Sequence, residues 1–76
     1  MATWRQVGGN HYKIYKLQPI EFISVNGIGF IPGNIIKYAC RVEKCMDLEK
    51  QLQDLDKVIH YAELWKESLI KVASDL

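Results

Sequence analysis

The stretch DLEKQLQDLDKVIHYAELWKESLIKVAS, residues 47–74, decides the fold of this chain. Its apolar residues recur every three or four positions, which is the spacing of one face of an α-helix. They are Leu48, Leu52, Leu55, Ile59, Ala62, Trp65 or Lys66, Leu69 and Val72. Charged and amide side chains fill the opposite face, so the pattern predicts one long amphipathic helix over 47–74.

This long helix is expected to carry more apolar surface than the chain can cover by itself. A chain of 76 residues buries only about 60% of the surface that its unfolded form exposes. Two shorter helices cannot cover the whole apolar stripe. The surplus predicts a helix–helix contact between copies of the chain, and we expect a homotetramer built as a dimer of dimers.

A short helix is predicted over residues 18–26. Pro19 suits its first turn, because the N–H that proline lacks would be unpaired there. Asn26-Gly27 ends it, with the glycine in the left-handed conformation. Residues 1–17 before it are expected to form an irregular or extended arm.

Another helix is predicted over residues 34–45. Residues 29–34 are expected to be a connector, and Asn34 is expected to cap the helix by accepting its exposed N–H groups. With the long helix, these elements predict a single all-α domain of three helices over residues 1–76.

Charge is distributed unevenly along the chain. Residues 1–44 contain six Lys and Arg against two acidic residues, a net charge of +4, whereas residues 45–76 contain four Lys against seven acidic residues, a net charge of −3. The first half is therefore expected to bind a small anion. Because the acidic half would repel a long polyanion, neither DNA nor RNA is an expected partner.

The two cysteines, Cys40 and Cys45, are not expected to form a disulfide, since residues five apart point to different faces of a helix. A zinc site would have to combine them with His11 and His60, and the C-x4-C spacing is at the loose edge of zinc patterns. No metal or cofactor is expected. The start of the chain lacks a secretory signal, and no apolar run reaches the roughly 20 residues that span a bilayer, which predicts a soluble cytoplasmic protein.

Two blocks concentrate the residues that could form a site: GNHYKIYKLQPIEFI, residues 9–23, and GFIPGNIIKYACR, residues 29–41. Their polar, aromatic and cationic members are His11, Tyr12, Gln18, Glu21, Asn34, Lys37, Tyr38 and Arg41. Arginine grips phosphate with a planar fork, lysine adds a point charge and tyrosine can stack on a base. The group therefore suits a planar, anionic ligand.

Lys37, Tyr38 and Arg41 are the strongest candidates, because spacings of three and four residues place them on one flank of a helix. Asn34 is expected at the start of that helix, where exposed N–H groups attract anions. The competing interpretation is a solvated helix flank with a packed tyrosine, and spacing alone does not separate the two.

The remaining candidates each have a simpler alternative role. His11-Tyr12 could bind a base by stacking and hydrogen bonding, or His11 could be merely exposed. Gln18 and Glu21 can face one pocket, although Glu21 could instead stabilise the first turn of its helix. Trp4 could close the pocket or pack as an anchor. The sequence has no P-loop, serine elbow or Rossmann fingerprint, so catalysis is not expected.

In order and spacing, these blocks resemble a family of small phage-encoded proteins, the SaV-like domain of unknown function. The matching residues lie within about 10–65 and are His11-Tyr12, Gln18–Ile23, Gly29-Phe30, Gly33-Asn34, Ile36–Tyr38, Arg41, Asp54–Lys57 and Tyr61. Between Arg41 and Asp54 the chain is longer than usual members by about one helical turn.

The resemblance implies two functions. A larger phage relative is a nucleotide kinase that acts on deoxynucleoside monophosphates without a P-loop. A small phage type is an anti-CBASS sponge, a homotetramer that sequesters cyclic dinucleotides and so blocks bacterial immune signalling. A kinase must hold two nucleotides, Mg²⁺ and the transferring phosphoryl group, whereas a sponge needs only affinity. The small size of this chain favours the sponge.

The expected function is therefore sequestration, without catalysis, of a cyclic dinucleotide of the 3'3'-cGAMP type in the cytoplasm of the phage host. In this hypothesis Lys37 and Arg41 neutralise phosphates, and aromatic stacking on the bases is assigned to Tyr12 and Tyr38. Hydrogen bonds to base or ribose are assigned to His11 and Asn34. The alternatives are a nucleotide kinase and an inhibitor that docks its apolar stripe on a host protein.

Overall fold

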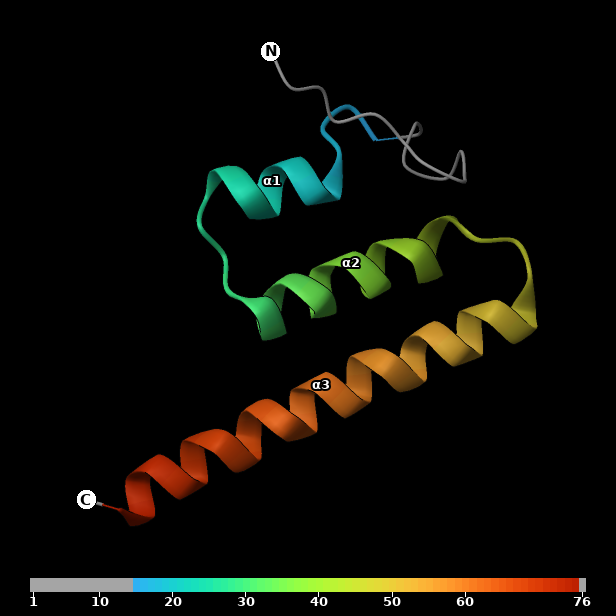
Figure 1. The fold of residues 1–76 in the computed structure, drawn as a ribbon. Coiled ribbons are helices and arrows are strands. Elements are labelled where there is room, and N and C mark those ends of the chain that lie inside the picture. The colour runs from blue at the N-terminus through green and yellow to red at the C-terminus, as the bar shows by residue number, and fades with distance from the viewer. Residues whose placement is uncertain (1–14, 76) are drawn as a thin grey trace.

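The structure, a computed structural model, describes residues 15–75. This part of the chain contains three α-helices (Figure 1). They are α1 (Pro19–Val25), α2 (Phe30–Lys44) and α3 (Leu48–Ser74). No strand occurs within 15–75, and the predicted all-α class with a long C-terminal helix is confirmed. Most of the predicted arm, with its candidates Trp4, His11 and Tyr12, lies outside the described residues.

The helix α2 lies between α1 and α3 (Figure 1). It runs antiparallel to α3 and packs against the N-terminal half of that helix. Because α3 has 27 residues and α2 has 15, roughly 18 Å of α3 extends past the start of α2 at a rise of 1.5 Å per residue. Within residues 15–75, none of the helices is both long and apolar enough to cross a membrane.

The ends of α1 follow the prediction from sequence. Pro19 occupies the first helical position, and Gly27 follows the helix with a φ of +63°, in the left-handed region. The N–H of Ile28 donates to the carbonyl oxygen of Ile23 at 3.0 Å, and the N–H of Gly27 donates to that of Ser24 at 3.1 Å. These are the two bonds of a Schellman motif, which pairs carbonyls that a helix end leaves open.

The start of α2 differs from the prediction, which was wrong by four residues: α2 begins at Phe30 and not at Asn34. Pro32 is the third residue of the helix, in the first turn, where an N–H has no intrahelical partner and its loss costs little. Gly33 lies in the helix and is buried, because α1 packs on it. A Cβ at Gly33 would lie 3.0 Å from Cγ2 of Ile23. Glycine therefore allows close helix packing at this position, despite its poor helix propensity.

The turn between α2 and α3 is held by side chains at the start of α3. Asp47 is the N-cap, and its Oδ1 accepts hydrogen bonds from two backbone N–H groups of the first turn at 3.0 and 3.4 Å. Gln51 Nε2 donates to the carbonyl oxygens of Val42, at 3.1 Å, and Cys45, at 2.8 Å. Gln51 thus pairs two carbonyls at the end of α2 and fixes the point where the chain reverses.

The apolar stripe of α3 is left largely uncovered by the other two helices. Among residues 15–75 Pro19 is the one buried residue with an apolar side chain, and the exposed fractions are 68% for Leu48, 53% for Leu52, 41% for Leu55 and 53% for Ile59. The helix α2 packs instead on a neighbouring face of α3, which includes Tyr61. The long helix therefore has two faces suited to packing, of which α2 uses one.

Candidate anion-binding site between α2 and α3

Tyr38 of α2 lies at the centre of a cationic cluster. The Nζ atoms of Lys37 and Lys57 lie 4.6 and 4.7 Å from the centroid of its ring, and Cζ of Arg41 lies 5.3 Å from it. All three distances fall within the roughly 6 Å over which a cation and an aromatic ring attract each other. Tyr61 of α3 stacks on the same ring, with centroids 6.2 Å apart and an interplanar angle of 12°. Lys37, Tyr38 and Arg41 thus lie together, as their spacing predicts, and α3 adds a third cation and a second ring.

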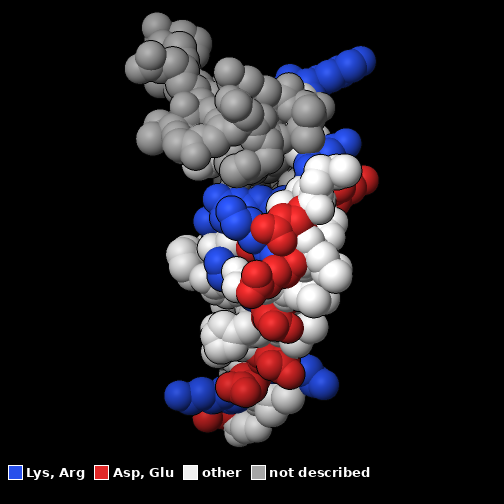
Figure 2. Space-filling model, turned by 90° about the vertical axis from the view of Figure 1, so that its right-hand side faces the viewer, with Lys and Arg blue, Asp and Glu red and all other residues white. Residues whose placement is uncertain are grey.

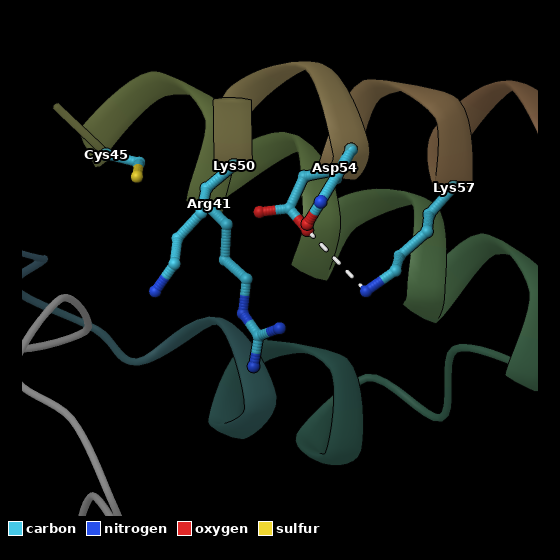
Figure 3. Close-up of a pocket in the computed structure, with 6 residues that line it drawn as sticks. Arg41, Cys45, Lys50, Asp54 and Lys57 are labelled. Carbon is cyan, nitrogen blue, oxygen red and sulfur yellow. Dashed lines mark ion pairs between the residues drawn. The ribbon is translucent and has the colours of Figure 1, made fainter. Parts of the chain in front are cut away.

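A cavity of about 360 Å³ opens beside this cluster, between the C-terminal half of α2 and the N-terminal half of α3. Its lining residues, most of which are labelled in Figure 3, are Arg41, Cys45, Lys50, Gln53, Asp54 and Lys57. Three cations and one carboxylate give this lining a net charge of +2. The volume lies in the range of small-molecule sites, about 300–1,000 Å³. The cavity therefore suits a small anion.

Asp54 is the acidic residue of the cavity and is 9% exposed. Its Oδ1 lies 3.8 Å from Nζ of Lys57, one helical turn away on α3. Figure 3 shows the carboxylate between the side chains of Arg41 and Lys57. A negative charge in this position offsets the mutual repulsion of the cations and keeps Lys57 on the cavity side of α3.

Tyr15 anchors the first described residues against α2. Its hydroxyl lies 3.1 Å from the carbonyl oxygen of Cys40 and 3.2 Å from Oε1 of Glu43, and these two acceptors share its single proton. Nζ of Lys44 lies 5.2 Å from the ring centroid. Burial, followed by the hydrogen bonds to Cys40 and Glu43, raises the pKa of Tyr15 well above its usual range. The segment before α1 is thereby held at the part of α2 that also supplies Arg41 to the cavity.

The other predicted site residues of the described chain lie elsewhere. Asn34 is not a helix cap: its Nδ2 donates to the carbonyl oxygen of Phe30 at 2.8 Å, within α2. With Lys37 it lines a second, shallower hollow of about 180 Å³ between α1 and α2. Gln18 is the N-cap residue of α1 and makes no side-chain cap bond, and Glu21 lies in the first turn of α1. The structure thus places Asn34, Gln18 and Glu21 outside the lining of the larger cavity.

Sequence reasoning misses Cys45, the C-cap residue of α2, and the contribution of α3 to the site, namely Lys50, Gln53, Asp54 and Lys57. A signal was present, because Asp54, Lys57 and Tyr61 are three and four residues apart, just as Arg41 is four residues from Lys37 and three from Tyr38. Spacing shows that such residues share a face of a helix. It does not show which face of a partner helix they meet.

Residues 7–63 match the family described as a protein of unknown function, DUF3310. The match covers three quarters of the chain. The chain belongs to the DUF3310 family. No curated protein and no solved structure matches it. The DUF3310 match spans α1, α2 and every residue that lines the cavity, whereas the part of α3 after residue 63 lies beyond it.

Proposed function

We propose that this DUF3310 protein binds a nucleotide at the cavity between α2 and α3 and sequesters it without chemical change. The observation that carries the proposal is the convergence of Arg41, Lys50 and Lys57 on one cavity beside the stacked rings of Tyr38 and Tyr61. Cations alone would suit any small anion. Aromatic rings next to them add a surface that suits a base.

Binding at Tyr38 involves an exchange of partners. The ring already has Tyr61 stacked on it and three cations within 5.3 Å. A phosphate offers these cations charge-assisted hydrogen bonds of about 1.5–3 kcal/mol, compared with about 0.5–1 kcal/mol for an exposed cation–π contact. Phosphate would therefore draw a lysine from the ring, and a base would take its place.

The proposed ligand is a cyclic dinucleotide of the 3'3'-cGAMP type. Its two phosphodiesters carry two negative charges, which match the net charge of +2 on the cavity lining. The resemblance to small phage proteins that act as anti-CBASS sponges supports the same ligand. Sequestration needs affinity alone. A cyclic dinucleotide is larger than the cavity of about 360 Å³, so the cavity would hold one of its two nucleotide units.

A deoxynucleoside monophosphate kinase is the second candidate, and Asp54 is the observation that favours it. A carboxylate in a cationic cavity is the kind of group that holds Mg²⁺ beside phosphates. A kinase must also bind a phosphoryl donor and align it with the acceptor, which requires more room than this cavity offers on one chain. Sequestration is therefore the stronger proposal.

The test is a calorimetric titration of the purified protein with 3'3'-cGAMP, other cyclic dinucleotides, deoxynucleoside monophosphates and ATP. The bound ligand is then released by heat and identified by chromatography and mass spectrometry. Tight binding of a cyclic dinucleotide that returns intact is expected, and Arg41→Ala is expected to abolish it without changing the oligomer. Phosphorylation of a monophosphate in the presence of ATP and Mg²⁺ would refute sequestration and support the kinase instead. Absence of binding to every nucleotide would refute both and favour the inhibitor of a host protein.

A further inference from the structure

The exposed apolar stripe of α3 follows a heptad repeat through the whole helix. Intervals of four and three residues alternate without a break along Leu48, Leu52, Leu55, Ile59, Ala62, Lys66, Leu69 and Ala73. These are the d and a positions of a coiled coil, beginning with d at Leu48. We call these eight positions the heptad stripe.

The heptad stripe is not the face of α3 that packs on α2. Tyr61 and Lys57 contact Tyr38 of α2, and Asp54 is buried beside the same helix. At about 100° per residue, Asp54 and Tyr61 lie roughly 110° and 130° around the helix axis from the centre of the heptad stripe. The stripe therefore stays accessible when α2 is in place, and 60% of Leu69 is exposed near its C-terminal end.

We propose that α3 pairs through the heptad stripe with α3 of a second copy of this chain, in parallel orientation. This inference goes beyond the proposed function and does not depend on it. The occupant is a second copy because the repeat spans more than three heptads with matching layers, which is the pattern by which identical helices pair.

The apolar surface available to this pairing supplies roughly a third to two thirds of the area that a standard complex buries per partner. Large apolar side chains of the stripe are 41–68% exposed, and Trp65, Ile70 and Val72 beside it are 40%, 56% and 58% exposed. Together they present roughly 260–510 Å² of apolar surface, at about 60–120 Å² for a fully buried aliphatic side chain. The remainder of the roughly 800 Å² per partner of a standard complex would come from the polar residues that flank the stripe.

Charge beside the stripe determines the orientation. Figure 2 shows acidic side chains that follow the length of α3. On one side of the stripe, the e positions are Glu49, Asp56, Glu63 and Ile70; on the other side, the g positions are Gln51, Val58, Trp65 and Val72. A parallel pair places each e position against a g position of the partner, so that acidic side chains meet uncharged ones, of which Gln51 is already hydrogen-bonded to the end of α2. An antiparallel pair would place the acidic e positions against each other, which is repulsive.

Lys66 is the charged member of the stripe, at an a position. A single lysine at such a position lowers stability but specifies register, because its layer must align with the same layer of the partner. Glu63 lies three residues before it on the same helix, within reach of its ammonium group. Lys66→Leu is therefore expected to strengthen the association.

Oligomeric state is tested by sedimentation velocity on the full chain, across concentrations from below to above 10 μM, a range typical of weak to moderate association. We expect a dimer or a multiple of it for the unaltered chain and a monomer for the double variant Leu55→Gln, Ile59→Gln. The matched control is Leu64→Gln, because Leu64 is also exposed, at 39%, but lies off the stripe. Helicity by circular dichroism shows that the variants fold. A monomeric unaltered chain, or equal dissociation by Leu64→Gln, would overturn the proposal.

Orientation is tested by oxidative crosslinking in a background with Cys40→Ser and Cys45→Ser, which removes the native thiols. Ala73→Cys and Leu48→Cys are introduced separately, at opposite ends of the stripe. In a parallel pair each introduced thiol faces its own counterpart, so each single variant forms a covalent dimer. An antiparallel pair brings residue 73 to residue 48, so that only a mixture of the two variants crosslinks; that result would overturn the proposed orientation. Nucleotide binding is measured separately, so its failure is distinguishable from failure of the pairing.

Discussion

Replacing Lys57 of α3 with alanine tests the contribution of this residue to ligand binding separately from its contribution to the stability of the fold. Lys57 lies 4.7 Å from the Tyr38 ring and 3.8 Å from Asp54. Its side chain is 49% exposed, and because water screens such a pair, the ion pair stabilises the fold by only about 0–1 kcal/mol. A charge-assisted hydrogen bond from Lys57 to a phosphate would contribute about 1.5–3 kcal/mol to binding. Lys57→Ala is therefore expected to weaken nucleotide binding roughly 10- to 150-fold while the free energy of unfolding changes by about 1 kcal/mol or less.

Two measurements on the same variants check this expectation: calorimetric titration for the affinity and urea unfolding for the stability. Lys57→Arg keeps the charge and should retain most of the affinity. Lys71→Ala removes the same charge from the last turn of α3, far along the helix from the cavity, and should leave affinity within about twofold. Equal losses in Lys57→Ala and Lys71→Ala would show that net charge, and not the cluster around Tyr38, determines binding. An unchanged affinity in Lys57→Ala would refute the assigned site.

Two further predictions concern the scaffold of the site. Gln51→Ala leaves two carbonyl groups at the end of α2 without their side-chain partner, and we expect a loss of about 1–2 kcal/mol in urea unfolding; Gln53→Ala, a nearby polar truncation on α3, should cost less than half as much. Tyr15→Phe is expected to cost about 0.5–1.5 kcal/mol near neutral pH, because the carbonyl oxygen of Cys40 and the carboxylate of Glu43 lose their shared donor. Since the folded state raises the pKa of Tyr15, its stabilising contribution is complete below the usual tyrosine pKa of about 10 and decreases as pH rises above it. The difference in stability between the unaltered chain and Tyr15→Phe should therefore shrink above about pH 10, and a difference that stays constant there would contradict the assigned hydrogen bonds.

The helix ends show where local sequence signals are sufficient. Pro19 and Gly27 place the ends of α1 because each acts through its own backbone, by a missing N–H or a positive φ. Asp47 marks the start of α3 through its side-chain cap. The same residue types mislead at α2, where Pro32 and Gly33 resemble a connector. Gly33 is there because α1 packs on it, and no local signal reports that contact.

The candidate site shows the same distinction. Some of its residues are brought together by a single helix, and others only by the packing of two helices. Lys37, Tyr38 and Arg41 are predictable together, since helical spacing alone puts them on one flank. Lys57 and Tyr61 reach Tyr38 only because α2 and α3 run antiparallel in one particular register. That register depends on where the chain reverses, which is fixed by the hydrogen bonds of Gln51 to the end of α2.

The sequence by itself determined the helical class, the length of α3 and the presence of an apolar heptad repeat on it, because each of these depends on residues close together in the chain. Only the tertiary structure decided which face of α3 meets α2. Periodicity orients side chains about the axis of their own helix but does not name the partner of each face. In α3 the aromatic and charged face with Tyr61 and Lys57 packs on α2, and this contact forms the cavity and leaves the heptad stripe exposed.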